Sequence, residues 1–159
     1  MNFTLKGRVL VGIGQAYWSA DIGETLIVRS IGSSGALALY DPTRHVGGLL
    51  HWLVPESDID PARARQDPGI FAETGIPYLI RGLESLGVDR RHLCATLAGA
   101  ARLREGGTID VGPRNLRMAR ELLRGIGIAL AREDTGGDCV RELSLEIGSG
   151  RVEIRRQNL

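Results

Sequence analysis

Ser34 and His51 are a pair of side chains whose types suit nucleophilic catalysis. A hydroxyl within hydrogen-bond reach of an imidazole can attack an acyl carbon while the ring takes up its proton, and a carboxylate often orients the ring. Asp41 and Asp134 are the candidate carboxylates, but their spacing along the chain fixes no geometry. Considered alone, Ser33-Ser34 is typical of a turn and His51 of a core histidine. The residue types therefore permit this chemistry without establishing it.

The composition narrows the class of protein. A chain of 159 residues is predicted to form one domain, residues 1–159, around a single core. The 20 basic and 19 acidic residues nearly cancel, so neither a nucleic acid nor an anionic membrane surface is a predicted partner. No apolar run reaches the roughly 20 residues that span a bilayer, and the first residues do not resemble a signal peptide. We therefore expect no membrane insertion and a cytoplasmic location.

Neither a metal ion nor a cofactor is predicted. Cys94 and Cys139 lie in apolar runs and have no partners at metal-ligand spacing, so both are expected to be buried, unpaired thiols. Gly12-Ile13-Gly14 is too short for a dinucleotide-binding fingerprint.

Short apolar runs separated by glycine predict a chain rich in strands. One helix is predicted to begin at Pro77 and end at Gly87, and a second to be capped by Asn115 and to run to Ile126. Residues 56–69 are polar and are expected to form an exposed loop. Strands followed by a mixture of helices and strands predict an α+β fold. The predicted strands are residues 8–13, 25–31, 36–40, 49–54, 92–98, 128–132, 140–147 and 152–154.

Five segments carry a family resemblance. They are Val-Gly-Ile-Gly at 11–14, Gly-Ser-Ser leading into a strand that ends Tyr-Asp-Pro at 32–42, Gly-Gly and a short run to His and Pro at 47–55, Val-Gly-Pro-Arg-Asn at 111–115, and Glu-Asp-Thr-Gly-Gly at 133–137. Together they extend over nearly the whole chain and resemble the CheD family of chemoreceptor glutamine deamidases. The resemblance implies a CheD-like α/β sandwich, with layered β-sheets and helices packed on the outer face.

The resemblance also implies a reaction and a set of site residues. In the family, a cysteine attacks the side-chain amide of a receptor glutamine, a histidine serves as base and acid, and a threonine orients the histidine. By position, the cysteine falls on Ser34, the histidine on His51 and the threonine on Val28. Backbone N–H groups near the nucleophile would bind the oxyanion, and the neighbouring Gly32 and Ser33 are expected to be binding residues.

Both departures from the family pattern weaken the expected reaction. A serine hydroxyl is far less ionised than a thiol near neutral pH and depends almost wholly on its base. Val28 cannot form a hydrogen bond, so His51 loses its expected orienter. On a regular strand Ser30 would point the same way as Val28 and Ser34, and could in principle replace the missing threonine.

Two explanations account for Ser34: a substitution made to trap an inactive enzyme, or natural divergence. Val28 also differs from the family, and Gly35 stands where the family commonly has Val. Natural divergence is therefore the favoured interpretation.

The resemblance predicts a chemoreceptor glutamine deamidase that hydrolyses glutamine side-chain amides of methyl-accepting chemotaxis proteins to glutamate, weak or inactive in this form. The alternative hypothesis is a non-catalytic binding module for a chemoreceptor or a CheC-type phosphatase, and a third is serine-based hydrolysis of another amide or ester. In the family, the segment corresponding to Gly99 and Ala100 lies near the surface used by the phosphatase, whereas tight internal packing would equally explain such small residues. The expected partners are the cytoplasmic domain of a chemoreceptor and, second, that phosphatase.

Overall fold

Two five-stranded β-sheets dominate the structure, a computed structural model that describes residues 3–102 and 110–157. Two neighbouring pairs of strands are parallel, Arg8–Leu10 with Thr25–Ile31 and Cys94–Gly99 with Ala129–Thr135, and the other neighbouring strands are antiparallel. The outer sheet has the strand order β1 (Phe3–Leu5), β2 (Arg8–Leu10), β4 (Thr25–Ile31), β9 (Val140–Glu146) and β10 (Val152–Gln157). The central sheet has the order β3 (Gln15–Ser19), β6 (Val46–Trp52), β5 (Gly35–Asp41), β7 (Cys94–Gly99) and β8 (Ala129–Thr135).

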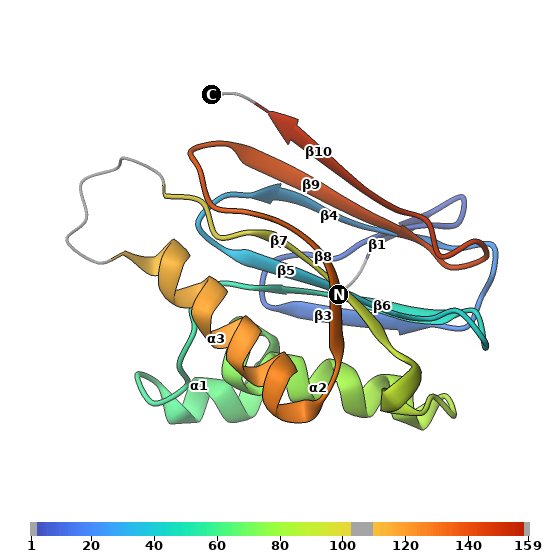
Figure 1. Cartoon of the computed structure of the whole chain (residues 1–159), viewed down its shortest axis with the longest axis horizontal. Helices are drawn as coiled ribbons and strands as arrows, with labels where there is room; N and C mark the ends of the chain where they lie inside the picture. The colour runs from blue at the N-terminus through green and yellow to red at the C-terminus, as the bar shows by residue number, and fades with distance from the viewer. Residues whose placement is uncertain (1–2, 103–109, 158–159) are drawn as a thin grey trace.

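In the part of the chain that the structure describes, three α-helices form a third layer beyond the central sheet (Figure 1). α2 (Ala72–Ser85) packs on β3 and β6, and α3 (Val111–Ile126) packs on β5, β8 and α2. The predicted α+β fold, with layered sheets and helices on the outer face, is confirmed. None of these helices is long and apolar enough to cross a membrane. The helices are α1 (Pro61–Gln66), α2 (Ala72–Ser85) and α3 (Val111–Ile126), with 3₁₀ turns at Pro68–Ile70 and Arg90–His92.

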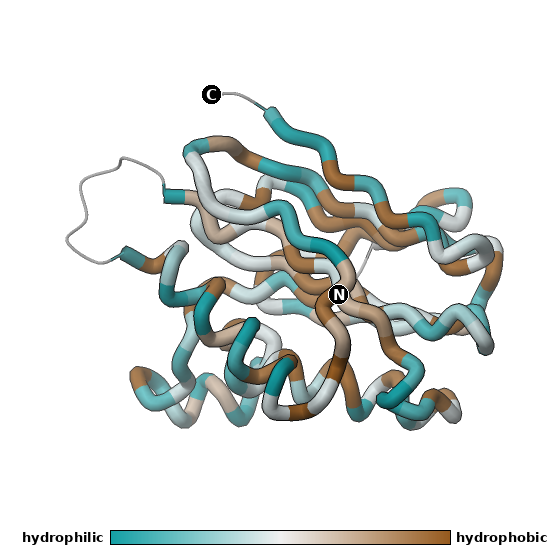
Figure 2. Tube along the Cα trace, in the orientation of Figure 1, coloured by the Kyte–Doolittle hydropathy of each residue, from teal (hydrophilic) through white to brown (hydrophobic). Residues whose placement is uncertain are grey.

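The central strands are buried on both faces. On β5, Leu37 and Leu39 pack towards the helices, whereas Ala36 and Ala38 lie between the two sheets, as the period of two along a strand requires. On the outer sheet, buried and partly exposed residues alternate along β9, and Figure 2 shows both hydrophobic and hydrophilic residues on this sheet, which is typical of a sheet with one face packed on a core. β5 and β6 are therefore packed on both faces, so the residues at their ends are held in fixed positions.

α2 begins at Ala72 rather than at Pro77. The carbonyl groups of Val54 and Pro55 accept hydrogen bonds from the N–H groups of Ala72 and Glu73, which satisfies donors at the start of the helix. Pro77 lies inside α2, where burial of one helix face against the central sheet outweighs its missing donor.

The segment predicted as a loop, residues 56–69, contains α1 and most of a 3₁₀ turn. Asp60 caps α1 by accepting a hydrogen bond from the backbone N–H of Arg63. Ala64 is the one buried residue of α1, so this helix has no apolar stripe that a sequence pattern could reveal.

Three further features differ from what the sequence predicted. Asn115 is not a cap, because α3 begins at Val111 and Asn115 lies inside the helix. β3 was not predicted, since its side chains are mostly half-buried and show no clear alternation. Cys94 is exposed at the start of β7, whereas Cys139 is buried as expected.

Candidate active site

Ser34 and His51 lie together at one end of two neighbouring strands. Ser34 immediately precedes β5, and His51 is the penultimate residue of β6, whose register places it opposite Ala36. Only 5% of the surface of Ser34 and 4% of that of His51 is exposed. The Ser34 Oγ and the His51 Nε2 are 2.9 Å apart, which is a hydrogen-bond distance. The structure thus brings together the two residues that the sequence selected for nucleophilic chemistry.

The imidazole of His51 is neutral near pH 7, because burial lowers the pKa of His51 from 6.5 to about 4. Within the described residues, Ser34 is the one hydrogen-bond partner of the ring. Asp41 lies at the opposite end of β5, and Asp134 is paired with Arg141. Neither candidate carboxylate completes a triad, so the site is a pair of residues.

Val28 is fully buried on β4, in the inter-sheet cluster that also contains Ala36. Its apolar side chain offers His51 no hydrogen bond. Ser30 does not replace it, contrary to the expected alternation, because the β4–β9 register shifts between Val28 and Ile31 and Ser30 has a φ of +57°. The Ser30 residue is exposed, and no hydrogen bond joins it to His51 in the described part of the chain.

A cavity of about 410 Å³ lies beside His51. Most of its lining is apolar, and its one charged side chain is that of the largely exposed Arg29, which pairs with Glu142. An uncharged side chain could reach the imidazole through it. Across residues 3–102 and 110–157, no three His, Cys, Asp or Glu side chains are grouped so as to hold a metal ion. The lining residues are Leu10, Val11, Gly12, Ile13, Ile27, Arg29, Ser30 and His51.

The end of β7 holds the backbone at Ser34. The N–H of Ala100 donates a 2.7 Å hydrogen bond to the carbonyl oxygen of Ser34. A Cβ on Gly99 would lie 2.5 Å from that oxygen, and the φ of Gly99 is +101°, so both the space and the conformation require glycine. Gly99 and Ala100 are buried by these internal contacts, and their part in partner binding stays a prediction. Gly32 and Ser33 are half-buried, and their part in binding likewise stays a prediction.

Trp52 and Asn115 also belong to the site, although the sequence did not single them out for it. The Trp52 Nε1 donates to the Asn115 Oδ1 at 3.1 Å, and the Asn115 Nδ2 donates to the Ser33 carbonyl at 2.9 Å. The indole ring fills the space beside Gly35, where a Cβ would lie 2.0 Å from a ring carbon. The pairing of a glycine on one strand with a tryptophan on the next is the signal that could have found Trp52.

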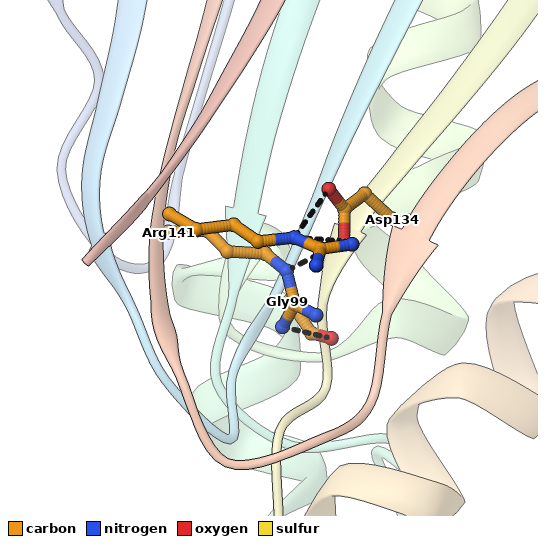
Figure 3. A network of polar contacts seen from close by, with 4 residues as sticks. Gly99, Asp134 and Arg141 are labelled. Atoms are coloured by element: carbon orange, nitrogen blue, oxygen red, sulfur yellow. Dashed lines mark hydrogen bonds and ion pairs between the residues drawn. The ribbon is translucent and has the colours of Figure 1, made fainter. Parts of the chain in front are cut away.

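A buried ion pair supports Gly99 from the outer sheet (Figure 3). Arg141 on β9 is 3% exposed; its Nε donates to the Asp134 Oδ1 at 3.0 Å and its Nη1 to the Gly99 carbonyl at 3.4 Å. Hydrogen bonds from Arg156 and from Arg141 hold the pKa of Asp134 below its usual value. The Arg141 guanidinium therefore links the outer sheet to the end of β7 that holds Ser34.

A serine hydroxyl beside a neutral histidine is a pairing that acyl-transfer hydrolases also use. Residues 53–156 match the model of the family described as CheD, chemotactic sensory transduction. The chain belongs to the CheD family, as the sequence motifs indicated.

Relatives match over almost the whole chain. A probable chemoreceptor glutamine deamidase CheD 1 of Syntrophus aciditrophicus is 37% identical over 150 residues, which cover 94% of each chain. A probable chemoreceptor glutamine deamidase CheD of Solibacter usitatus is 40% identical over 149 residues, 93% of this chain and 88% of the relative. A protein of the same name from Methanococcus vannielii is 36% identical over 150 residues, 93% of this chain and 91% of the relative.

Proposed function

We propose that this chain is a chemoreceptor glutamine deamidase of the CheD type, which hydrolyses glutamine side-chain amides to glutamate and is weak or inactive in its present form. The observation that carries the proposal is the 2.9 Å contact between the Ser34 Oγ and the His51 Nε2. These two residues occupy the nucleophile and base positions of the family resemblance. The names of the relatives support a chemoreceptor as substrate.

With a cysteine at position 34, the geometry accommodates a complete reaction. The sulfur attacks the amide carbon while His51 takes the thiol proton, and backbone N–H groups at Gly32 and Ser33 stabilise the oxyanion. His51 passes the proton to the departing ammonia, which leaves a thioester. His51 then accepts a proton from the water that attacks the thioester, and it returns this proton to the departing sulfur, which releases glutamate and the free thiol.

Ser34 makes the first step slow. Its hydroxyl must lose its proton during the attack, and His51 is a weak base because burial holds its pKa at about 4. Val28 adds no hydrogen bond that would hold the ring in position. The pair therefore keeps the separation that the chemistry needs but lacks the driving force for proton transfer.

A second candidate function is a non-catalytic module that binds a chemoreceptor or a CheC-type phosphatase. The combined departures at Ser34 and Val28, in a site that remains well packed, favour it. Under either candidate we infer a cytoplasmic location. We also infer one domain over residues 1–159, because the two hydrophobic clusters share the central sheet.

Mass spectrometry of a chemoreceptor cytoplasmic fragment tests the proposal. The fragment is incubated with the protein as it is, with Ser34→Cys, and with Ser34→Cys/His51→Gln as the control for the base. We expect conversion of glutamine to glutamate with Ser34→Cys and far less with the other two. Conversion by none of them contradicts the deamidase, and retention of the fragment in a pull-down would then support the binding module.

A further inference from the structure

Asn115 is a polar side chain without exposed surface, inside α3 and facing the central sheet. A buried amide is costly unless its donors and acceptor are satisfied. Three hydrogen bonds satisfy the Asn115 amide: the Nδ2 donates to the carbonyl oxygens of Ser33 and Leu53, at 2.9 and 3.0 Å, and the Oδ1 accepts from the Trp52 Nε1 at 3.1 Å. The surrounding groups therefore satisfy almost all of the hydrogen-bonding capacity of this side chain.

The orientation of the Asn115 amide follows from these partners. An indole N–H can only donate, and a backbone carbonyl can only accept. If the amide turned over, its N–H₂ group would face the Trp52 N–H and its oxygen would face two carbonyl oxygens. All three contacts would then be repulsive, so one orientation is fixed.

The two carbonyl groups belong to the two segments that carry the candidate catalytic pair. Ser33 immediately precedes Ser34, and Leu53 is the second residue after His51. The Asn115 N–H₂ group therefore binds the segment just before β5 and the segment just after β6 at the same time. At this point the hydrogen bonds between β5 and β6 have ended and no longer join the two segments.

We propose that Asn115 is a positioning residue that sets the separation of Ser34 and His51 by clamping the Ser33 and Leu53 carbonyl groups to α3. Its catalytic meaning rests on the proposed deamidase function, but its structural effect does not. A hydrogen bond of 2.9 Å weakens steeply when its ends move apart, and a misplacement of about 1 Å can cost about 100-fold in rate. Loss of the clamp should therefore weaken the hydrogen bond between Ser34 and His51.

The first test is an NMR titration of His51 in the protein as it is and in Asn115→Ala. Alanine removes the amide and favours helix, so α3 itself is not weakened. Water that enters to solvate the two freed carbonyl groups also reaches the imidazole, and we expect the pKa of His51 to rise from about 4 towards the usual value of about 6.5.

Ala119→Gly is the matched control. Ala119 is fully buried one turn further along α3, and glycine there loosens the helix by about 1 kcal/mol without touching either carbonyl. The pKa of His51 should stay at about 4 in this variant. A His51 pKa that is unchanged in Asn115→Ala, or equally raised in both variants, overturns the clamp whatever reaction the chain catalyses.

The second test measures the pair chemically, without a receptor. In Ser34→Cys, the rate at which iodoacetamide alkylates the introduced thiol is followed by peptide mass spectrometry, which separates it from Cys94 and Cys139. We expect His51→Gln to lower this rate by about tenfold, and Asn115→Ala to lower it by about the same factor. Because both act through one contact, the triple variant should react like either double variant.

Additive losses in the triple variant would show that Asn115 does not act through His51. If His51→Gln has no effect on the thiol, the deamidase proposal fails, and the NMR titration alone then decides the clamp. Should Asn115→Ala not fold, Trp52→Phe removes the N–H that orients the amide and should give a smaller change of the same sign in both measurements. An unchanged His51 in a folded Trp52→Phe variant overturns the proposal.

Discussion

The Trp52 indole on β6 occupies the space in which a side chain at Gly35 on β5 would lie. The two residues are direct partners in the register, and a Cβ on residue 35 would lie 2.0 Å from the Trp52 Cζ2. The glycine that follows Ser34 is therefore required by the indole ring of the strand that carries His51. A valine at this position would not fit beside the Trp52 indole in this chain.

Gly35→Ala should destabilise the protein by about 3 kcal/mol, because the new methyl group overpacks a rigid ring. Urea denaturation measures the change in the free energy of unfolding. In a Trp52→Leu background the same substitution should cost close to nothing. Gly125→Ala is the control: nothing lies within 4 Å of a Cβ at this position in α3, and the helix should gain about 1 kcal/mol. Equal costs of Gly35→Ala in both backgrounds would show that the Trp52 ring is not what excludes a side chain at position 35.

The stability of the protein should depend on pH through His51. The pKa of His51 is about 4 in the native state and about 6.5 in the unfolded chain, so the unfolded state binds more protons between these values. The free energy of unfolding should therefore fall by about 3 kcal/mol as the pH drops from about 6.5 to about 4, and this contribution should level off below that. Denaturation at several pH values checks it.

His51→Gln should lack this slope while keeping a neutral, polar side chain. Acidic groups with lowered pKa values, such as Asp134, add their own loss of stability at still lower pH, and they do so equally in both proteins. Identical pH profiles for the two proteins between pH 6.5 and 4 would mean that His51 titrates normally.

Val28→Thr in the Ser34→Cys protein should raise the rate of glutamine deamidation by about tenfold, because the hydroxyl restores a group that can orient the imidazole. The rate is read from glutamate formation in the receptor fragment. Val9→Thr provides a buried hydroxyl in the same inter-sheet cluster, where it should leave the rate unchanged. A similar gain from both substitutions would argue against an orienting role at position 28.

Arg141→Met should cost about 3 kcal/mol, since it removes one partner of a buried ion pair and leaves the Gly99 carbonyl with one donor fewer. Arg155→Met removes a largely exposed arginine from a surface pair and should cost less than about 1 kcal/mol. Thermal or urea unfolding of the two variants compares them directly. Equal effects would mean that Arg141 contributes no more than a surface charge.

Much of the fold could be predicted from local sequence. The strand predicted at residues 25–31 coincides with β4, Thr25–Ile31, because β-branched residues dominate it. The strand predicted at 36–40 lies within β5, Gly35–Asp41, and the layer order followed from the family motifs. Continuous apolar runs identified strands that are buried on both faces.

Other features depend on contacts that no local pattern carries. The exposed position of Ser30 follows from a register shift and a positive φ, and these break the period of two on which its predicted direction depended. Asparagine is a common helix cap, yet the Asn115 amide donates hydrogen bonds to carbonyl groups from two distant segments. The Ser34–His51 contact was foreseen only by analogy with a family, since the residue types alone suggested a turn and a core histidine.

The sequence separations within the site have a consequence for the order of assembly. Ser34 and His51 are 17 residues apart on one antiparallel hairpin, whereas Asn115 is 82 residues from Ser33 and 62 from Leu53. Closing a short loop costs less chain entropy than closing a long one, so the hairpin can bring the pair together before α3 docks. We expect the reactive groups to meet early in folding, within a mobile ribbon. Their fixed spacing then arises in the last step, when the third layer closes over the central sheet.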